Sequence, residues 1–351
     1  MVEVSHSLEK FWQLRPEIPL VDARSPGEFG HSHIPEAINL PILNDEERVQ
    51  VGTLYKNSGA LPATLKGFEL VGPRFHEIQK SALNQFPDRK VIIYCWRGGM
   101  RSQILSWLLS QVGFQVFRLE GGYKSYRKFT FDQVRLPFPF LVLGGKTGTG
   151  KTVLLQKLRE EGEQVIDLEA LAHHKGSSFG SIGQKPQPSV EHFENLLAEQ
   201  LRLFDSKNPI WIENESQRIG NILLPESMYV QMTQSPRIEI QKTNEERIEH
   251  ISQEYAQLNA LELMDAVKRI QKRLGGLRTQ QALEDIRNEN HASWIANMLL
   301  YYDKAYEFDL QRHDPDKTMV VDLHKKSLSQ QVNLLLHVKN NFYGKFSGIA
   351  D

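Results

Sequence analysis

The sequence is poor in cysteine, and this scarcity excludes several kinds of protein. Cys95 is the single thiol among 351 residues, so the chain can form neither an internal disulfide nor a multi-cysteine zinc cluster. That composition is typical of a reducing compartment. No run of about 18 apolar residues occurs, so we expect no segment that spans a membrane. The N-terminus, MVEVSHSLEKFW, lacks the apolar stretch of a secretory signal, and we expect a cytoplasmic protein.

Neither sign of charge is in excess, because 42 Lys and Arg residues nearly balance 43 Asp and Glu residues. Any binding of nucleic acid must therefore depend on a local basic patch and not on net charge. The apolar content of 40% is that of an ordinary globular protein, and the length is suited to two domains.

Short apolar runs that alternate with helical stretches predict an α/β fold. In the first part of the chain, the runs at 18–24, 91–95 and 115–119 predict buried strands. Residues 102–113 have the apolar spacing of a helix that ends at Gly113. Strands separated by helices imply a parallel sheet.

A second series of strands predicts a second α/β domain. Strands are predicted at 140–145, 164–168 and 209–213, and the pattern from about 244 onward is mainly helical. Residues 191–204 predict an amphipathic helix with one apolar face, formed by Phe193, Leu196, Leu197, Leu201 and Phe204.

Proline and the loss of helical spacing mark the boundary between the two domains. We expect a parallel-sheet domain over 1–130, a linker over 131–139, and a second domain with a helical C-terminal part over 140–351.

The stretch GGKTGTGKT has the spacing of a phosphate-binding P-loop between a buried strand and a helix. Its glycines let backbone N–H groups close around a phosphate, its lysine reaches the outer oxygens, and its threonine can hold a metal. The helix that follows adds the positive end of its dipole. A structural glycine-rich turn is the alternative. The residues expected to bind a diphosphate are Gly145, Gly148, Gly150, Lys151 and Thr152.

The partners of this loop are less evident from the sequence. A strand-end aspartate usually holds Mg²⁺ in such sites, and here Asp167, Glu213 and Glu215 end strands or follow them. They could contact metal or substrate, or remain solvated. The loop HHKGSSFG offers Lys175 and Ser177 to a second anion or to the edge of a substrate, unless it is a plain mobile loop. No histidine spacing indicates a metal site, so we assign none, although Mg²⁺ could bind near the P-loop.

Cys95 is expected to be a reactive thiol. It ends a buried strand, where α/β sheets place their chemistry, and a glycine-rich turn leads from it into a helix. The backbone of Gly98 and Gly99 and the charges of Arg97 and Arg101 would stabilise a thiolate and hold an anion beside it. A small buried hydrophobic residue is the alternative.

Three segments resemble the rhodanese family over roughly residues 5–130. They are VDARSPGEFGHSHIPEAINLP (21–41), CWRGGMRS (95–102) and LEGGYKSY (119–126). The resemblance implies that Cys95 carries a terminal sulfur or selenium atom and passes it on. Arg101 lies six residues after the cysteine, one more than in the common sulfurtransferase loop, which implies a wider cradle. The loop could therefore belong to a phosphatase, or to a transferase that takes its chalcogen from a phosphate ester. Tyr94 stands where those phosphatases usually have histidine.

The whole chain resembles the bacterial tRNA 2-selenouridine synthases. The resemblance rests on five segments in this order: CWRGGMRS, GGKTGTGKT, DLEALAHHKGSSFG, IWIENESQRIG and VKRIQKRLGG. It implies that 2-thiouridine at the wobble position of tRNA is S-geranylated from geranyl diphosphate and then converted to 2-selenouridine with selenophosphate. The P-loop would hold the departing diphosphate, and Cys95 would receive selenium held by Arg97, Gly98, Gly99 and Arg101. No tightly bound cofactor is implied.

A basic stripe is the expected tRNA contact. Lys268, Arg269, Lys272 and Arg273 recur at helical spacing and would meet tRNA phosphates, although a solvated face has the same pattern. Tyr301 and Tyr302 could stack on a base or pack in the core.

Two other functions remain open on the residues alone. One is a P-loop phosphotransferase fused to a rhodanese-like phosphatase or regulatory domain. The other is a phosphate-gated interaction module without enzymatic activity.

Overall fold

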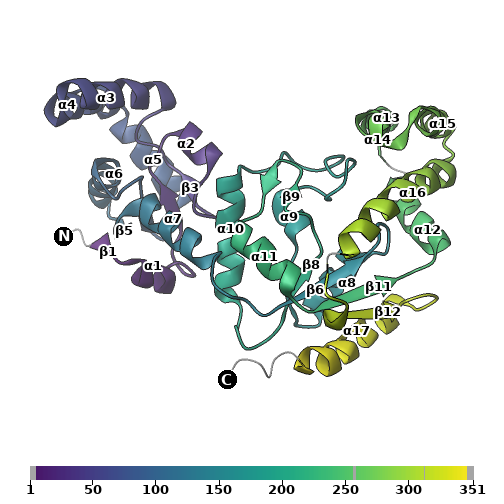
Figure 1. Cartoon of the computed structure of the whole chain (residues 1–351). Helices are drawn as coiled ribbons and strands as arrows, with labels where there is room; N and C mark the ends of the chain where they lie inside the picture. The colour runs from purple at the N-terminus through teal and green to yellow at the C-terminus, as the bar shows by residue number, and fades with distance from the viewer. Residues whose placement is uncertain (1–4, 256–257, 312, 346–351) are drawn as a thin grey trace. The chain divides into compact units, whose positions relative to one another are not determined.

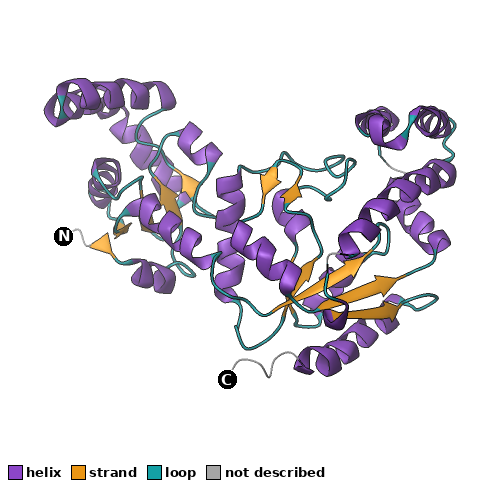
Figure 2. Cartoon of the chain, in the orientation of Figure 1, coloured by secondary structure: helices purple, strands orange, loops and turns teal. Residues whose placement is uncertain are grey.

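The computed structural model describes residues 5–255, 258–311 and 313–345 and divides into two compact units, coloured along the chain in Figure 1. The first unit comprises Met1–Gln133 and Glu191–Glu199, and the second comprises Val134–Val190 and Gln200–Asp351. Each contains a five-stranded parallel sheet with helices around it (Figure 2). The predicted fold class, α/β with two parallel sheets and a helical C-terminal region, is confirmed.

The sheet of the first unit has the strand order β1-β5-β4-β2-β3, and every neighbouring pair is parallel. Residues 91–94 of the central strand are all buried, as expected for a parallel strand covered on both faces. The strands predicted at 91–95 and 115–119 are present, and the one at 18–24 is shorter than predicted. The strands are β1 (Ser5–His6), β2 (Leu20–Asp22), β3 (Ile38–Asn39), β4 (Lys90–Tyr94) and β5 (Gln115–Leu119).

The helices of the first unit connect these strands. They are α1 (Leu8–Leu14), α2 (Pro26–His31), α3 (Asp45–Ser58), α4 (Ala60–Val71), α5 (Phe75–Gln85), α6 (Met100–Ser110) and α7 (Gly122–Gln133). The helix predicted at 102–113 is α6, which ends earlier because a turn leads into Gly113 with φ of 86°. Helix α7 continues into the segment 131–139 predicted as a linker. The prolines of this segment are Pro137 and Pro139, near its end, so the residues at its start can still be helical.

The predicted amphipathic helix at 191–204 is α10 (Val190–Leu203), and its residues 191–199 belong to the first unit. The fully buried Asn195 holds α10 against the rest of the first unit. Its side-chain amide donates to Ser32 Oγ at 3.1 Å, His33 O at 2.9 Å and Tyr123 Oη at 2.9 Å. Arg127 donates to Asn195 Oδ1 at 2.6 Å. The predicted domain 140–351 included all of α10, whereas residues 191–199 belong to the first unit. A hydrophobic pattern could not indicate this, because it says nothing about a buried asparagine.

The sheet of the second unit has the order β12-β11-β6-β8-β7, again with parallel pairs throughout. Its strands are β6 (Phe140–Gly145), β7 (Gln164–Ile166), β8 (Ile210–Glu213), β11 (Arg237–Gln241) and β12 (Thr318–Asp322), beside an antiparallel hairpin of β9 (Arg218–Ile219) and β10 (Ile222–Leu223). Strand β12 lies within the region expected to be mainly helical. It is an edge strand with little buried surface, so its apolar signal is weak.

The helices of the second unit include a group with its own apolar cluster around Phe179, Tyr255 and Trp294. This group is α12 (Asn244–Tyr255), α13 (Ala260–Arg269), α14 (Gln271–Leu274), α15 (Gly276–Arg287) and α16 (His291–Leu310). The others are α8 (Lys151–Glu160), α9 (Leu168–Ala172), α11 (Glu226–Gln234) and α17 (Leu328–Phe342). Within the described residues, no helix is both long enough and apolar enough to cross a membrane.

We expect Asn195→Ala to lower the free energy of unfolding by roughly 2–4 kcal/mol, because it removes several buried hydrogen bonds at once and leaves their partners without replacement. Urea denaturation measures the change. Leu203→Ala, at a position 70% exposed near the end of the same helix, is the control and should cost less than about 0.5 kcal/mol. Equal effects of the two substitutions would contradict a structural role for Asn195.

Candidate active site

Cys95 follows β4 at the carboxyl end of the first sheet, and the loop 96–99 leads from it into α6. Its Sγ lies 3.2 Å from Ser102 Oγ and 3.7 Å from the carbonyl oxygen of Gly99. The residue is 3% exposed and packs among the apolar residues beneath the sheet edge. In this arrangement the thiol points into its own loop, with its sulfur covered.

The segment 119–126 closes the cysteine loop from the other side. Gly122 has φ of 57°, and a Cβ placed there would lie 2.2 Å from the carbonyl oxygen of Cys95 and 2.5 Å from Gly98 N. The N–H of Tyr123 donates to the same Cys95 oxygen at 2.8 Å. A glycine is therefore required at 122 for the two segments to meet.

The two arginines of the loop have different surroundings. Arg101 Nη1 is 2.5 Å from Glu28 Oε2, and Arg97 is exposed. Arg48 also reaches Glu28, at 3.1 Å. Burial raises the pKa of Glu28, but the hydrogen bond and charge of Arg101 outweigh burial and hold that pKa below its usual range. Arg101 is thus ion-paired with Glu28 at the start of α6.

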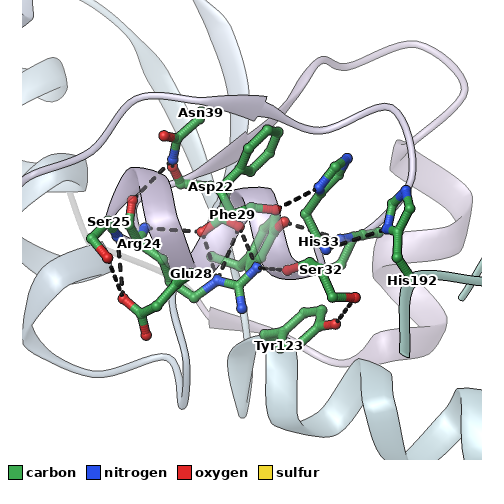
Figure 3. A network of polar contacts seen from close by, with 12 residues as sticks. Asp22, Arg24, Ser25, Glu28, Phe29, Ser32, His33, Asn39, Tyr123 and His192 are labelled. Carbon is green, nitrogen blue, oxygen red and sulfur yellow. Dashed lines mark hydrogen bonds and ion pairs between the residues drawn. The ribbon is translucent and has the colours of Figure 1, made fainter. Parts of the chain in front are cut away.

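A buried ion pair supports the base of this site (Figure 3). The Arg24 guanidinium donates to both oxygens of Asp22, with its Nη2 2.6 Å from Oδ2, and also to the carbonyl oxygen of Ser32 at 2.7 Å. It lies 3.9 Å from the centroid of the Tyr123 ring. Asn39 donates to the carbonyl oxygens of Asp22 and Arg24, both at 2.9 Å. The rhodanese-like segment 21–41 therefore supplies the support beneath the cysteine loop.

The P-loop of the second unit has the strand–loop–helix geometry that the sequence predicted. Gly148 and Gly150 have φ of 84° and 81°, and α8 begins directly after Gly150. Lys151 Nζ donates to the carbonyl oxygen of Gly145 at 2.9 Å, so the lysine folds back over the loop. Arg247 braces the loop from outside through the carbonyl oxygen of Thr147, at 2.8 Å.

Three carboxylates gather beside the P-loop. One oxygen from each of Glu169, Glu213 and Glu215 lies within 4.8 Å of the others. Thr152 Oγ1 is 3.4 Å from Glu169, and Lys151 Nζ is 3.7 Å from Glu213. Burial and the neighbouring carboxylates raise the pKa of Glu169 to about 10, and burial, with Glu215 adding to it, raises the pKa of Glu213 to about 8 although Lys151 opposes the shift.

This cluster fits Mg²⁺. Carboxylate and hydroxyl oxygens are the ligands that Mg²⁺ takes. Glu213 is 2% exposed, and its Oε2 has no hydrogen-bond partner among the described residues, so a buried lone pair is free to accept a cation. Asp167 is placed differently: its Oδ1 caps α9 by accepting from Ala170 N at 2.8 Å.

The loop 173–180 lies against the carboxylates and the helical group. A Cβ at Gly176 would lie 2.8 Å from Glu215 Oε1 and 3.1 Å from Glu169 Oε1. Lys175 Nζ is 3.5 Å from Glu254, and Ser177 Oγ accepts from Phe179 N at 3.2 Å. The structure thus brings the predicted loop and the predicted P-loop together.

The basic residues expected on one helix fall on two. Lys268 and Arg269 end α13, and Lys272 and Arg273 lie on α14, because the helix breaks at Ile270. All four side chains are exposed. Arg269 donates to Ser178 O at 2.8 Å, and Arg273 donates to Tyr301 Oη at 3.2 Å. Tyr301 and Tyr302 pack against the apolar cluster of the helical group.

Sequence reasoning missed three residues that shape these sites. Glu169 is two positions after Asp167, and the assignment of metal ligands to strand ends passed over it. Ser102 closes the motif CWRGGMRS, yet only the fold shows its contact with Cys95 Sγ. Arg247 is distant in sequence from the P-loop that it braces and carried no local signal.

Comparisons with known proteins match both units to families. Residues 138–334 match the model of the tRNA 2-selenouridine synthase AAA domain, and residues 7–129 match the rhodanese-like domain. The tRNA 2-selenouridine synthase of Sulfurovum sp. is 36% identical over 84% of this chain and 89% of its own length. That of Hydrogenovibrio crunogenus is 35% identical over 94% and 100%, and that of Pseudomonas fluorescens is 37% identical over 84% and 89%.

Glu213→Gln should stabilise the fold more at pH 8 than at pH 5. The pKa of Glu213 is about 8 in the folded chain, whereas an unfolded glutamate titrates near about 4.3. Between these values the unfolded state loses its proton and the folded state keeps it, so stability falls as pH rises through this window. The amide cannot ionise and removes that loss.

Urea denaturation of both proteins at the two pH values measures this difference. The exposed Glu262→Gln is the matched control. An equal gain at pH 5 and pH 8 for Glu213→Gln would show that its carboxyl group is not shielded as the structure indicates.

Proposed function

The chain belongs to the tRNA 2-selenouridine synthase family, and from this premise we propose that its two units act in turn on one wobble 2-thiouridine. The second unit transfers a geranyl group to the sulfur, and the first unit replaces the S-geranyl group with selenium from selenophosphate. The P-loop is the observation that supports this proposal. Its geometry suits a phosphate group, and the overall reaction does not demand hydrolysis of ATP. The loop is therefore available to bind the diphosphate of geranyl diphosphate.

In the first step the P-loop would hold the diphosphate of geranyl diphosphate. The sulfur of 2-thiouridine attacks the first carbon of the geranyl group, the C–S bond forms, and the C–O bond to the diphosphate breaks. Negative charge grows on the departing oxygen, and the N–H groups of the loop together with Lys151 would stabilise it. Lys151 would exchange its contact with Gly145 O for the diphosphate.

Mg²⁺ would be held by Thr152 and the carboxylates Glu169, Glu213 and Glu215, and bound there it would offset the charge of the diphosphate. Without a cation, the raised pKa of Glu169 and of Glu213 keeps protons on this cluster. The carboxylates would then lose those protons as a cation binds.

In the second step the loop of Cys95 would bind selenophosphate. Water would cleave its P–Se bond so that phosphate leaves, and the hydroselenide formed would be held beside Cys95 without an S–Se bond. Alkylation has made the sulfur a thioether, so selenium can form a bond to C2 while the C2–S bond breaks and geranyl thiol leaves. Selenium has the same oxidation level in selenophosphate and in the product, so the overall exchange requires no external oxidant or reductant. Arg97 and Arg101 supply positive charge at the loop, and Arg101 would have to leave Glu28 to reach the bound anion.

The exposed basic residues of α13 and α14 would contact the tRNA backbone. Lys272 and Arg273 lie beyond the break at Ile270, and Arg269 reaches the loop 173–180 beside the carboxylate cluster. A phosphate chain bound on these residues would pass close to the P-loop, where the first step occurs. Arg278 follows on α15 and is also exposed.

Two substitutions should separate the two steps. Cys95→Ala should reduce selenium incorporation to background while S-geranylated tRNA accumulates, and Lys151→Ala should lower prenyl transfer by roughly 100-fold or more. Mass spectrometry of digested tRNA measures both nucleosides. Lys157→Ala, at a lysine on the same helix whose side chain is 45% exposed, is the control and should be active. Loss of both steps in Cys95→Ala would refute the assignment of one step to each unit.

Charge reversal of the basic surface should weaken tRNA binding. We expect Lys272→Glu with Arg273→Glu to raise the Kd for tRNA about tenfold or more at low salt and to reduce the slope of log Kd against log salt concentration. Fluorescence anisotropy with labelled tRNA measures both. Lys207→Glu, at another exposed site of the second unit, is the control. An unchanged Kd would place the tRNA on a different surface.

A further inference from the structure

The first unit contains a large cavity beside the cysteine loop. Binding of a small anion at that loop does not account for a cavity of this size. The cavity has a volume of about 1140 Å³. One side is formed by Trp96, Met100 and Arg101, which belong to the loop after Cys95 and the start of α6. The opposite side is formed by α3 and α4, which lie side by side in Figure 1. A site for selenophosphate alone would need far less space.

The helices that form the outer wall exceed what the sheet requires. The connections β2 to β3 and β4 to β5 each contain one helix, which suffices for a parallel crossover. The connection β3 to β4 contains three α-helices, of which α5 buries Ile78 and Ala82 while α3 buries no residue. Helices α3 and α4 therefore add a wall beside the loop beyond what the crossover needs.

This wall presents large apolar side chains to the cavity, beside the polar Thr53, Lys56 and Thr64. Val49 and Tyr55 of α3 and Phe68 of α4 line the cavity and remain 59%, 65% and 44% exposed. Met100 joins the wall to the loop, since Thr64 Oγ1 lies 3.6 Å from its sulfur. When an apolar ligand covers apolar side chains that were exposed to solvent, the burial makes the free energy of binding more favourable.

The cavity has a cluster of paired charged side chains where it meets the cysteine loop. There Glu28 pairs with Arg101 at 2.5 Å and with Arg48 at 3.1 Å, and all three residues line the cavity. A ligand that fills it must therefore be amphipathic, with a polar head beside Arg101 and an extended apolar chain toward α3 and α4. The S-geranylated nucleoside has this character: its uracil ring is polar and its ten-carbon chain is not.

We propose that this cavity binds the geranyl chain of the S-geranylated tRNA intermediate during the second step. The inference rests on the proposed function. Chain burial against α3 and α4 would place C2 of the uracil next to the Cys95 loop and would hold the thioether as geranyl thiol leaves. It would also give the first unit a preference for geranylated tRNA over unmodified 2-thiouridine tRNA, so that selenium transfer follows prenyl transfer.

The test compares two anticodon stem-loops, one with S-geranyl-2-thiouridine and one with S-methyl-2-thiouridine, as substrates for selenium replacement by the full chain. Wild type should favour the geranyl substrate in kcat/KM by about tenfold or more. Phe68→Glu puts a charge in the apolar wall at a partly exposed site, and it should lose most of that preference while its rate on the S-methyl substrate is unchanged. Val49→Glu, on the other helix, should do the same.

Leu65→Glu is the matched control. Leu65 is 63% exposed on the same helix as Phe68 and lies outside the residues that line the cavity, so its substitution should leave the preference intact. Thermal melting of each variant checks that the first unit is folded.

The outcomes separate this inference from the function on which it rests. If wild type replaces the S-geranyl group with selenium but Phe68→Glu and Val49→Glu keep the geranyl preference, the cavity does not hold the chain. If these variants instead raise KM for geranyl diphosphate in prenyl transfer, the cavity serves the first step and the inference is overturned. If wild type cannot use the S-geranyl substrate at all, the proposed function itself fails.

Discussion

Both loops that carry the proposed chemistry depend on backbone atoms that approach too closely for any side chain. At Gly122 a Cβ would lie 2.2 Å from the carbonyl oxygen of Cys95, and at Gly148 it would lie 2.9 Å from the carbonyl oxygen of Arg247. Both glycines also have positive φ. Each loop is thereby held between its own strand and a distant segment. This close packing fixes the conformation of a glycine-rich stretch, as the anion sites that we propose there require.

Buried charge is balanced in the first unit and unbalanced in the second. In the first, Asp22 and Arg24 form a matched pair in which both groups are hydrogen-bonded, so the pair can serve as a rigid support for the cysteine loop. In the second, Glu169, Glu213 and Glu215 outnumber the single Lys151 beside them. Burial, with the neighbouring carboxylates adding to it, raises the pKa of Glu213, so protons can relieve this excess of negative charge. In the proposed reaction a cation would relieve it instead.

The first unit combines a small, closed sulfur site with a large, open apolar cavity. The thiol of Cys95 is covered by its own loop, and Arg101 is bound to Glu28 in the charged cluster of the cavity. Arg101 is therefore the residue that both the proposed anion site and the proposed chain-binding cavity would use.

The sequence by itself determined the parts whose signal is local. The P-loop, the strand that ends at Cys95 and the parallel α/β class followed from the spacing of glycine and apolar residues, because these patterns reflect contacts between near neighbours in the chain. Strand β12 escaped prediction because an edge strand buries too little apolar surface to leave a clear pattern. Only the tertiary structure decided which distant groups meet. It brought Asn195 to Tyr123, Glu169 to Glu213 and Arg101 to Glu28, because such polar contacts depend on where the backbone carries each side chain and leave no period in the sequence.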